Sequence, residues 1–136
     1  MIWWLVSIVW IMLALFLSGQ AGDSSALLSD GIAEPTYGII HRFFPGLSYA
    51  GYGMLVRKLA HFGLHAVLAF ALFRASSYSF RRKGAALATA LIIALIVALF
   101  DELIQLEAPG RYSTVMDAGI NVFGVFVGTS LSAIFP

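Results

Sequence analysis

Four long apolar stretches alternate with shorter polar segments along the 136-residue chain. A transmembrane helix needs about 20 mostly apolar residues to cross a hydrocarbon core of ~30 Å. The stretches at about 1–19, 54–73, 84–105 and 115–135 approach or reach this length. We therefore predict an all-α integral membrane protein, a four-helix bundle that forms a single domain over residues 1–136.

The first stretch has a rival interpretation as a secretory signal peptide. Residues 1–17 are apolar apart from Ser7, as the central region of a signal peptide would be. A signal peptide opens with a positively charged region, however, and this chain has no Lys or Arg before Arg42. The pattern therefore favours a first transmembrane helix.

Polar and aromatic residues are mixed in the connection from residue 19 to residue 53. Asp23 is a good N-cap for one short helix, and Pro35 is typical of the first turn of another, which would end before Pro45. This pattern predicts one or two short interfacial or re-entrant helices between spans one and two, covering a polar site in the bundle. A loop without helices is the alternative, and the aromatic content of the segment disfavours it.

Composition strengthens the membrane assignment and removes several classes of function. Hydrophobic residues make up 60% of the chain and charged residues 11%, whereas soluble domains carry about 25% charged residues. The net charge of +1 gives no reason to expect a nucleic-acid partner. The absence of cysteine excludes disulfides, thiolate metal ligands and cysteine nucleophiles. No sequence feature requires a cofactor, and we expect none.

Charge asymmetry predicts which way the chain crosses the membrane. Residues 74–83 hold four of the eight Lys and Arg residues and no Asp or Glu. The positive-inside rule places this basic segment, and with it both termini, in the cytoplasm. The segments 18–57 and 106–114 then face outside. This orientation brings the polar residues of three predicted helices to one level near the outer leaflet.

Charged side chains in a membrane are costly to insert and therefore point to function. The stretch from Asp101 to Gly128 holds four of the seven Asp and Glu residues. Other polar residues come from the start of the second predicted span. The candidate catalytic residues are His61, Asp101, Glu102 and Asp117, and the candidate ligand-binding residues are Arg57, Lys58, Gln105, Arg111 and Asn121. Mutual ion pairing that only fixes the helices is the simpler alternative.

These residue types suit two kinds of chemistry. Histidine is the side chain best suited to proton transfer near neutral pH, and Asp101 or Glu102 could orient His61 in general acid–base catalysis. The guanidinium groups of Arg57 and Arg111 match the geometry of a phosphate. The sequence therefore predicts a site that binds an outer-leaflet phosphate or carries out proton transfer, and it does not choose between them.

Metal binding and nucleophilic catalysis have less support. His61 and His65 have the spacing of zinc-binding helices, but Phe62 stands where the zinc metalloproteases carry glutamate. We therefore predict no metal site. Ser113 lies in a turn and belongs to no motif of a serine nucleophile.

Several short motifs follow one another in a distinctive order. RKLAHF at 57–62 precedes DELIQ at 101–105, PGR at 109–111 and D-x-x-x-N-x-x-G at 117–124. In this combination the chain resembles the VanZ-like family of bacterial membrane proteins over nearly its whole length. The residues that carry the resemblance are Lys58, His61, Phe62, Asp101, Glu102, Gln105, Pro109, Gly110, Arg111, Asp117, Asn121 and Gly124.

The resemblance implies a protein of the bacterial cytoplasmic membrane with a role in the cell envelope, since the founding VanZ protein is linked to resistance to the glycopeptide teicoplanin. We expect it to bind an outer-leaflet lipid, a polyprenyl-linked cell-wall precursor or a lipophilic glycopeptide antibiotic. The alternative is a membrane-embedded hydrolase or transferase that acts on a lipid-linked phosphate or head group. A small transporter is disfavoured because the polar residues form no track across the membrane.

The chain departs from the pattern of the family in two places. Leu64 and His65 stand where many relatives carry Glu-Tyr, and Ile104 stands where many carry histidine. A mechanism that needs that glutamate or that second histidine therefore does not transfer to this chain.

Overall fold

Five α-helices make up the described part of the chain. A computed structural model describes residues 1–111 and 113–135. The helices are α1 (Ile2–Ser18), α2 (Gly22–Phe43), α3 (Tyr49–Ser79), α4 (Lys83–Glu107) and α5 (Val115–Ile134), and the described residues contain no strand. The prediction of an all-α fold is confirmed.

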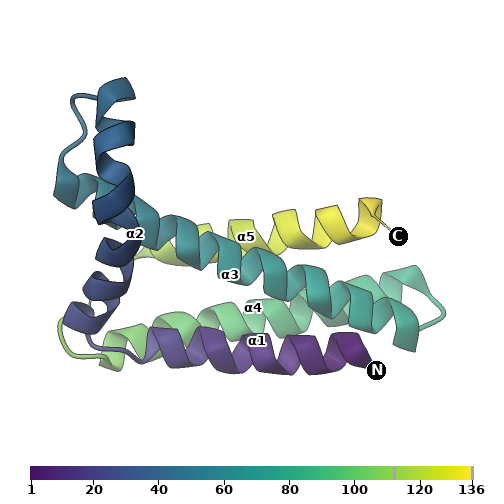
Figure 1. Ribbon diagram of the computed structural model, residues 1–136. Helices are drawn as coiled ribbons and strands as arrows, with labels where there is room; N and C mark the ends of the chain where they lie inside the picture. The colour runs from purple at the N-terminus through teal and green to yellow at the C-terminus, as the bar shows by residue number, and fades with distance from the viewer. Residues whose placement is uncertain (112, 136) are drawn as a thin grey trace.

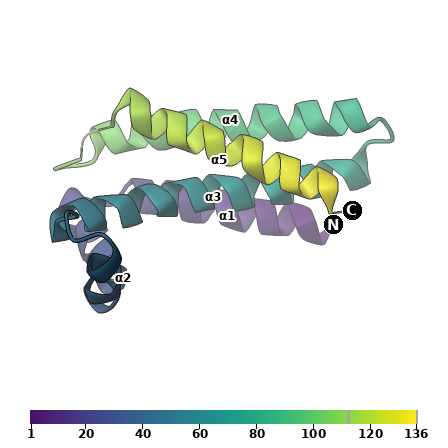
Figure 2. The same cartoon turned by 90° about the horizontal axis from the view of Figure 1, so that it is seen from above.

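Four helices lie side by side, and the remaining one stands across one end of them (Figures 1 and 2). α1, α3, α4 and α5 form the bundle, whereas α2 turns away from α1 through a bend of 112°. The α4–α5 connection lies at the same end as α2, which we call the α2 end. The N-terminus, the end of α5 and the α3–α4 loop lie at the opposite end, which we call the terminal end.

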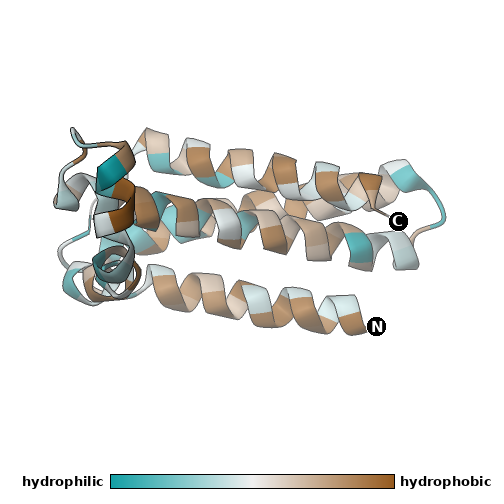
Figure 3. Ribbon diagram, turned by 45° about the horizontal axis from the view of Figure 1, so that its top comes forward, coloured by the Kyte–Doolittle hydropathy of each residue, from teal (hydrophilic) through white to brown (hydrophobic). Residues whose placement is uncertain are grey.

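The bundle has the apolar helices of a multi-pass membrane protein. α3, α4 and α5 are each long and apolar enough to cross a membrane, and α1 together with the bent α2 forms a fourth candidate. α1 alone has 17 residues, a rise of about 26 Å. Hydrophobic colours dominate the bundle helices, and hydrophilic ones gather in α2 and around the α3–α4 loop (Figure 3). The predicted helical membrane bundle is therefore confirmed, with three or four candidate spans.

The connection after the first span is helical, as predicted, but its helix is longer than expected. It forms one helix, α2, which has 22 residues and includes Pro35 in its interior. Proline removes one hydrogen bond of a helix, so the chain on both sides must be held by other contacts. Ala33 is fully buried in a cluster with residues of α3, and the Tyr37 hydroxyl donates to the Leu47 carbonyl at 2.8 Å. Tertiary packing thus continues the helix through the proline.

α3 is longer than the predicted second span at 54–73. It has 31 residues and a length of about 46 Å, so it exceeds the hydrocarbon core. The predicted basic loop at 74–83 is helical as far as Ser79. Arg74 therefore lies inside α3, where its Nη1 donates to the Phe135 carbonyl at 2.9 Å and its guanidinium lies 5.7 Å from the Trp3 ring centre.

α3 and α5 pack closely at two glycines of α5. A Cβ atom added to Gly124 would lie 2.5 Å from the Phe62 carbonyl oxygen, and one added to Gly128 would lie 1.9 Å from that of Ala66. Real Cβ atoms essentially never come within 3.0 Å of such an atom. The two glycines therefore serve packing inside the bundle. This close crossing brings the polar residues of α3 and α5 together at the α2 end.

Candidate functional site

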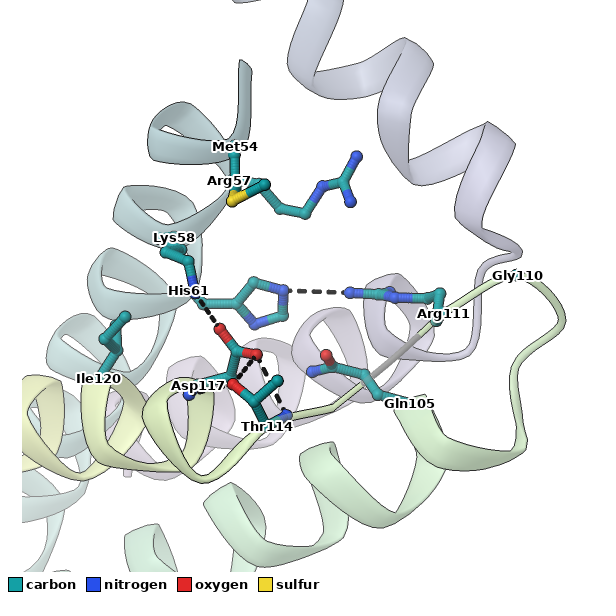
Figure 4. A pocket seen from close by; sticks show the side chains of 10 residues that line it. All are labelled: Met54, Arg57, Lys58, His61, Gln105, Gly110, Arg111, Thr114, Asp117 and Ile120. Carbon is teal, nitrogen blue, oxygen red and sulfur yellow. Dashed lines mark hydrogen bonds and ion pairs between the residues drawn. The ribbon is translucent and has the colours of Figure 1, made fainter. Parts of the chain in front are cut away.

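A cavity of about 290 Å³ opens at the α2 end, between α3, the α4–α5 connection and the start of α5 (Figure 4). Three cationic side chains and one carboxylate line it, beside neutral polar and apolar groups. The lining residues are Met54, Arg57, Lys58, His61, Gln105, Gly110, Arg111, Thr114, Asp117 and Ile120. Six of the nine residues that the sequence nominated are among them.

Close backbone contacts hold the α4–α5 connection in shape. Gly110 has φ of +71°, a left-handed conformation that favours glycine. At the start of α2, the Gly22 N–H donates to the Pro109 carbonyl at 2.9 Å, and a Cβ atom on Gly22 would lie 2.2 Å from the Gly110 carbonyl oxygen. α2 therefore docks directly on the turn, and the turn presents Arg111 to the cavity.

The cap of α5 positions Asp117. Thr114 and Asp117 form a capping box, in which Asp117 Oδ2 accepts from the Thr114 N–H at 3.2 Å and from its hydroxyl at 2.6 Å. The other carboxylate oxygen pairs with Lys58 Nζ at 2.5 Å. The simple ion-pairing interpretation therefore applies to these two residues, and the charge of Lys58 is neutralised within the site.

Arg111 binds backbone carbonyls and a histidine. Its Nη1 donates to the carbonyl oxygens of Leu17 and Ser18 at the end of α1, both at 3.1 Å. Its Nη2 lies 3.3 Å from Nε2 of His61. Burial lowers the pKa of the Arg111 guanidinium, and the nearby positive charge of Arg57 lowers this pKa further. No carboxylate among the described residues lies at ion-pair distance from Arg111.

Behind the cavity, Asp101 is the centre of a buried polar network. It is 1% exposed and accepts hydrogen bonds from the Ser18 hydroxyl, from Gln105 Nε2 at 2.7 Å and from Asn121 Nδ2 at 3.2 Å. These donors come from α1, α4 and α5. Among the described residues neither Lys nor Arg pairs with Asp101, so hydrogen bonds from neutral side chains stabilise this carboxylate in place of a lysine or arginine.

Glu102 extends the network to the α4–α5 connection. Its carboxylate accepts from Asn121 Nδ2 at 2.6 Å and from the Ser113 hydroxyl. Asn121 therefore bridges two adjacent carboxylates with one amide group. Both carboxylates and Asn121 are buried, and these hydrogen bonds join the C-terminal part of α4 to α5.

Two histidines of α3 face Asp101. Nδ1 of His61 lies 3.4 Å and Nε2 of His65 lies 3.7 Å from the same carboxylate oxygen. A guanidinium can only donate, so Nε2 of His61 accepts from Arg111, and a neutral His61 carries its proton on Nδ1, toward Asp101. A carboxylate orients the histidine of many general bases in this way. Here the nitrogen that would act on a substrate is covered by Arg111.

Comparison with protein families yields a match to the VanZ/LLP1 family over residues 3–136, which is nearly the whole chain. The chain belongs to the VanZ/LLP1 family. The family resemblance inferred from the motifs is thereby confirmed, and the protein is a VanZ-like membrane protein whose link to teicoplanin resistance comes through its family. Searches of curated proteins and of solved structures gave no match.

In this VanZ-like protein all nine nominated residues lie together at the α2 end. Arg57, Lys58, His61, Gln105, Arg111 and Asp117 line the cavity, and Asp101, Glu102 and Asn121 form the buried network with Gln105. Their catalytic or ligand-binding roles stay predictions. The described residues contain no group of three or more His, Asp or Glu side chains that could hold a metal ion; the absence of a metal also stays a prediction.

Three residues of the network had no assigned role in the sequence. Ser18 could have been suspected, because it is a polar residue that ends an apolar run. His65 lies one helical turn after His61, on the same face of α3. Ser113 gives no signal, because a serine in a turn is ordinary. His65, which departs from the usual pattern of the family, also lies against Asp101.

Proposed function

We propose that this VanZ-like protein binds the anionic head group of an outer-leaflet amphiphile: a membrane lipid, a polyprenyl-linked cell-wall precursor or a lipophilic glycopeptide. The observation that carries the proposal is a hydrogen-bond donor of Arg57 that has no partner among the described residues. This residue lines the cavity, and its buried Nε has no hydrogen-bond partner among the described residues. A buried polar group without a partner is costly, so an acceptor in the cavity that draws the guanidinium group toward it is favoured.

The charges around the cavity favour an anion. Of the three cations that line it, Lys58 is neutralised by Asp117, whereas Arg57 and Arg111 are not paired with a described carboxylate. The two guanidinium groups extend toward each other from α3 and from the α4–α5 connection (Figure 4). A phosphate or carboxylate between them would accept hydrogen bonds from both and relieve their repulsion.

A second cavity, mostly apolar and of about 130 Å³, adjoins the first beneath α2. Arg57 and His61 line both cavities. The apolar side of the second cavity includes Leu28 and Ile32 of α2 and Leu64 of α3. An apolar slot next to a cationic one suits a molecule with a hydrocarbon part and an anionic part, so the two cavities favour an amphiphile over a soluble anion.

The positive-inside rule supports an outward-facing α2 end. The α3–α4 loop at the terminal end carries Arg81 and Arg82, and Lys83 begins α4, so this end belongs in the cytoplasm together with both termini. In that orientation the cavity meets the outer leaflet of the bacterial cytoplasmic membrane. Lipid-linked wall precursors and glycopeptides are found on that side, which connects the site with the resistance linked to the family.

A matched pair of lipids tests the proposal. Protein in nanodiscs is supplied with a polyprenyl phosphate or with the uncharged polyprenol, and the retained lipid is counted by native mass spectrometry. We expect retention of the phosphate over the alcohol. Arg57→Gln should weaken retention of the phosphate by about 10- to 150-fold, because it removes a charge-assisted hydrogen bond.

Arg42→Gln is the control, because Arg42 is an exposed residue of α2 that lines none of the cavities described here. It loses the same charge and should retain the phosphate as the wild type does. Equal retention of phosphate and alcohol would overturn the proposal, as would equal losses in the two variants.

The alternative, a membrane hydrolase, is favoured by one observation: His61 lies between Asp101 and the cavity. In such a reaction the oxygen of water bonds to phosphorus while the bond from phosphorus to the leaving oxygen breaks. Nε2 of His61 would take the proton from water and pass it to the leaving oxygen. Arg111 would first have to move from Nε2 onto the phosphate.

Incubation with a polyprenyl diphosphate distinguishes the two functions. A hydrolase releases inorganic phosphate and polyprenyl monophosphate, which mass spectrometry detects, and His61→Gln abolishes this product. A binding protein retains the diphosphate unchanged, and its His61→Gln variant still binds it.

A further inference from the structure

A further cavity lies at the terminal end, at the opposite end of the bundle from the cavity at the α2 end. It has a volume of about 480 Å³ and is formed by the ends of α3 and α5, the α3–α4 loop and the start of α4. Polar and cationic side chains from these elements line it, namely Arg74, Ser77, Tyr78, Arg81, Lys83 and Ser132. The family motifs at 57–62 and 101–124 contribute none of them.

The cavity is strongly cationic. Arg74, Arg81 and Lys83 line it, and no carboxylate side chain does. The sequence has no Asp or Glu at all between residues 35 and 100 or after residue 117. The 25-residue helix α4 also begins here, and no side chain caps its first N–H groups, so the positive end of its dipole adds to the field.

Two of the polar residues that line the cavity each have one donor atom without a described hydrogen-bond partner. Ser132 is 3% exposed, and its hydroxyl has no hydrogen-bond partner among the described residues. Arg74 is held by the Phe135 carbonyl at 2.9 Å and lies 5.9 Å from the Tyr78 ring centre, yet its buried Nε is also without a described partner. A hydroxyl and a guanidinium nitrogen beside the cavity are therefore unsatisfied, and an acceptor bound there would satisfy them once the side chains turn toward it.

We propose that this cavity binds the phosphate of an anionic phospholipid in the leaflet at the terminal end, with the phosphate among Arg74, Arg81 and Lys83. Basic pockets between membrane helices are suited to such head groups. Phe73, Tyr78 and Phe80 add aromatic surface, which is favoured at the boundary between head groups and hydrocarbon. In the proposed orientation this is the cytoplasmic leaflet. The inference does not depend on what the α2 end binds.

The cysteine-free sequence allows a local test of occupancy. Ser77→Cys places one thiol in the cavity, and Ser79→Cys places one nearby on the exposed end of α3, outside it. The rate of maleimide labelling is measured in nanodiscs of phosphatidylcholine, in nanodiscs with a rising fraction of phosphatidylglycerol, and in phosphatidylcholine with soluble glycerol phosphate. We expect phosphatidylglycerol to slow the labelling of Ser77→Cys but not that of Ser79→Cys, and glycerol phosphate to have no comparable effect.

Neighbouring arginines of the loop provide the matched variants. Arg81 lines the cavity, whereas Arg82 does not. In the Ser77→Cys background, Arg81→Gln should raise the fraction of phosphatidylglycerol needed for protection by about fivefold, and Arg82→Gln should leave it unchanged. Equal effects of the two variants would mean a general attraction of anionic lipid to basic residues and would overturn the site. Absence of protection, equal protection of Ser79→Cys, or equal protection by glycerol phosphate would overturn it too.

Discussion

Replacing Gly128 by alanine perturbs the closest contact between α3 and α5. The new Cβ atom would lie 1.9 Å from the Ala66 carbonyl oxygen, and a tolerable separation starts at 3.0 Å. The two helices must therefore move apart by about 1.1 Å, the difference between these distances. Overpacking of this kind costs about 1–3 kcal/mol in well-packed proteins.

Gly119→Ala is the matched control on the same helix, because no atom lies within 4 Å of a Cβ atom added there. Alanine favours a helix over glycine by up to about 1 kcal/mol, and both variants gain this contribution. The difference between them isolates the clash, and we expect Gly128→Ala to be less stable than Gly119→Ala by about 1–3 kcal/mol.

Tryptophan fluorescence can follow this difference during unfolding in increasing amounts of a denaturing detergent. All three tryptophans are in α1, and Trp10 Nε1 donates to the Leu64 carbonyl of α3 at 2.8 Å, so loss of the bundle changes their environment. Equal stability of the two variants would show that α3 and α5 do not cross closely at Gly128.

Three further predictions concern orientation, metal and the buried network. Single cysteines introduced by Ser77→Cys and Ser113→Cys should be labelled from opposite sides in intact cells; labelling of Ser77→Cys alone by an impermeant reagent would invert the topology. Protein purified without added metal should contain no stoichiometric zinc by elemental analysis, although His61 and His65 share one helix face. Asp101→Asn should cost about 1–3 kcal/mol in detergent unfolding, because neutral hydrogen bonds replace charge-assisted ones; no loss of stability would contradict the network around this residue.

Much of the architecture follows from the order of apolar and polar residues. Runs of membrane length predict helices. Because four spans are an even number, both termini and the connection between the second and third spans are predicted to lie at one end of the bundle. The convergence of His61, Asp101, Arg111 and Asp117 also follows, because helices that alternate in direction bring these positions to the same end of the bundle. Each of these arguments depends only on length, direction and charge.

The parts that could not be predicted depend on contacts between distant residues. Pro35 is a sound signal of a helix start, but burial of Ala33 against α3 overrides it. The sequence pattern assigns the basic residue Arg74 to a loop, but it lies inside α3 and donates to the carbonyl of Phe135, 61 positions away. The bond from Ser18 to Asp101 joins residues 83 positions apart, and nothing local to either residue announces it.

The central claim, that the cavity at the α2 end holds an anionic head group between Arg57 and Arg111, is tested most directly by locating that group in a crystal. The protein would be crystallised in a lipid phase with a polyprenyl selenophosphate, whose selenium scatters anomalously. Arg57→Gln crystals would serve as the control. We predict an anomalous peak in the wild-type cavity, within hydrogen-bond reach of both guanidinium groups, that is lost in the variant. An empty α2-end cavity, or a peak there that persists in Arg57→Gln, would contradict the account.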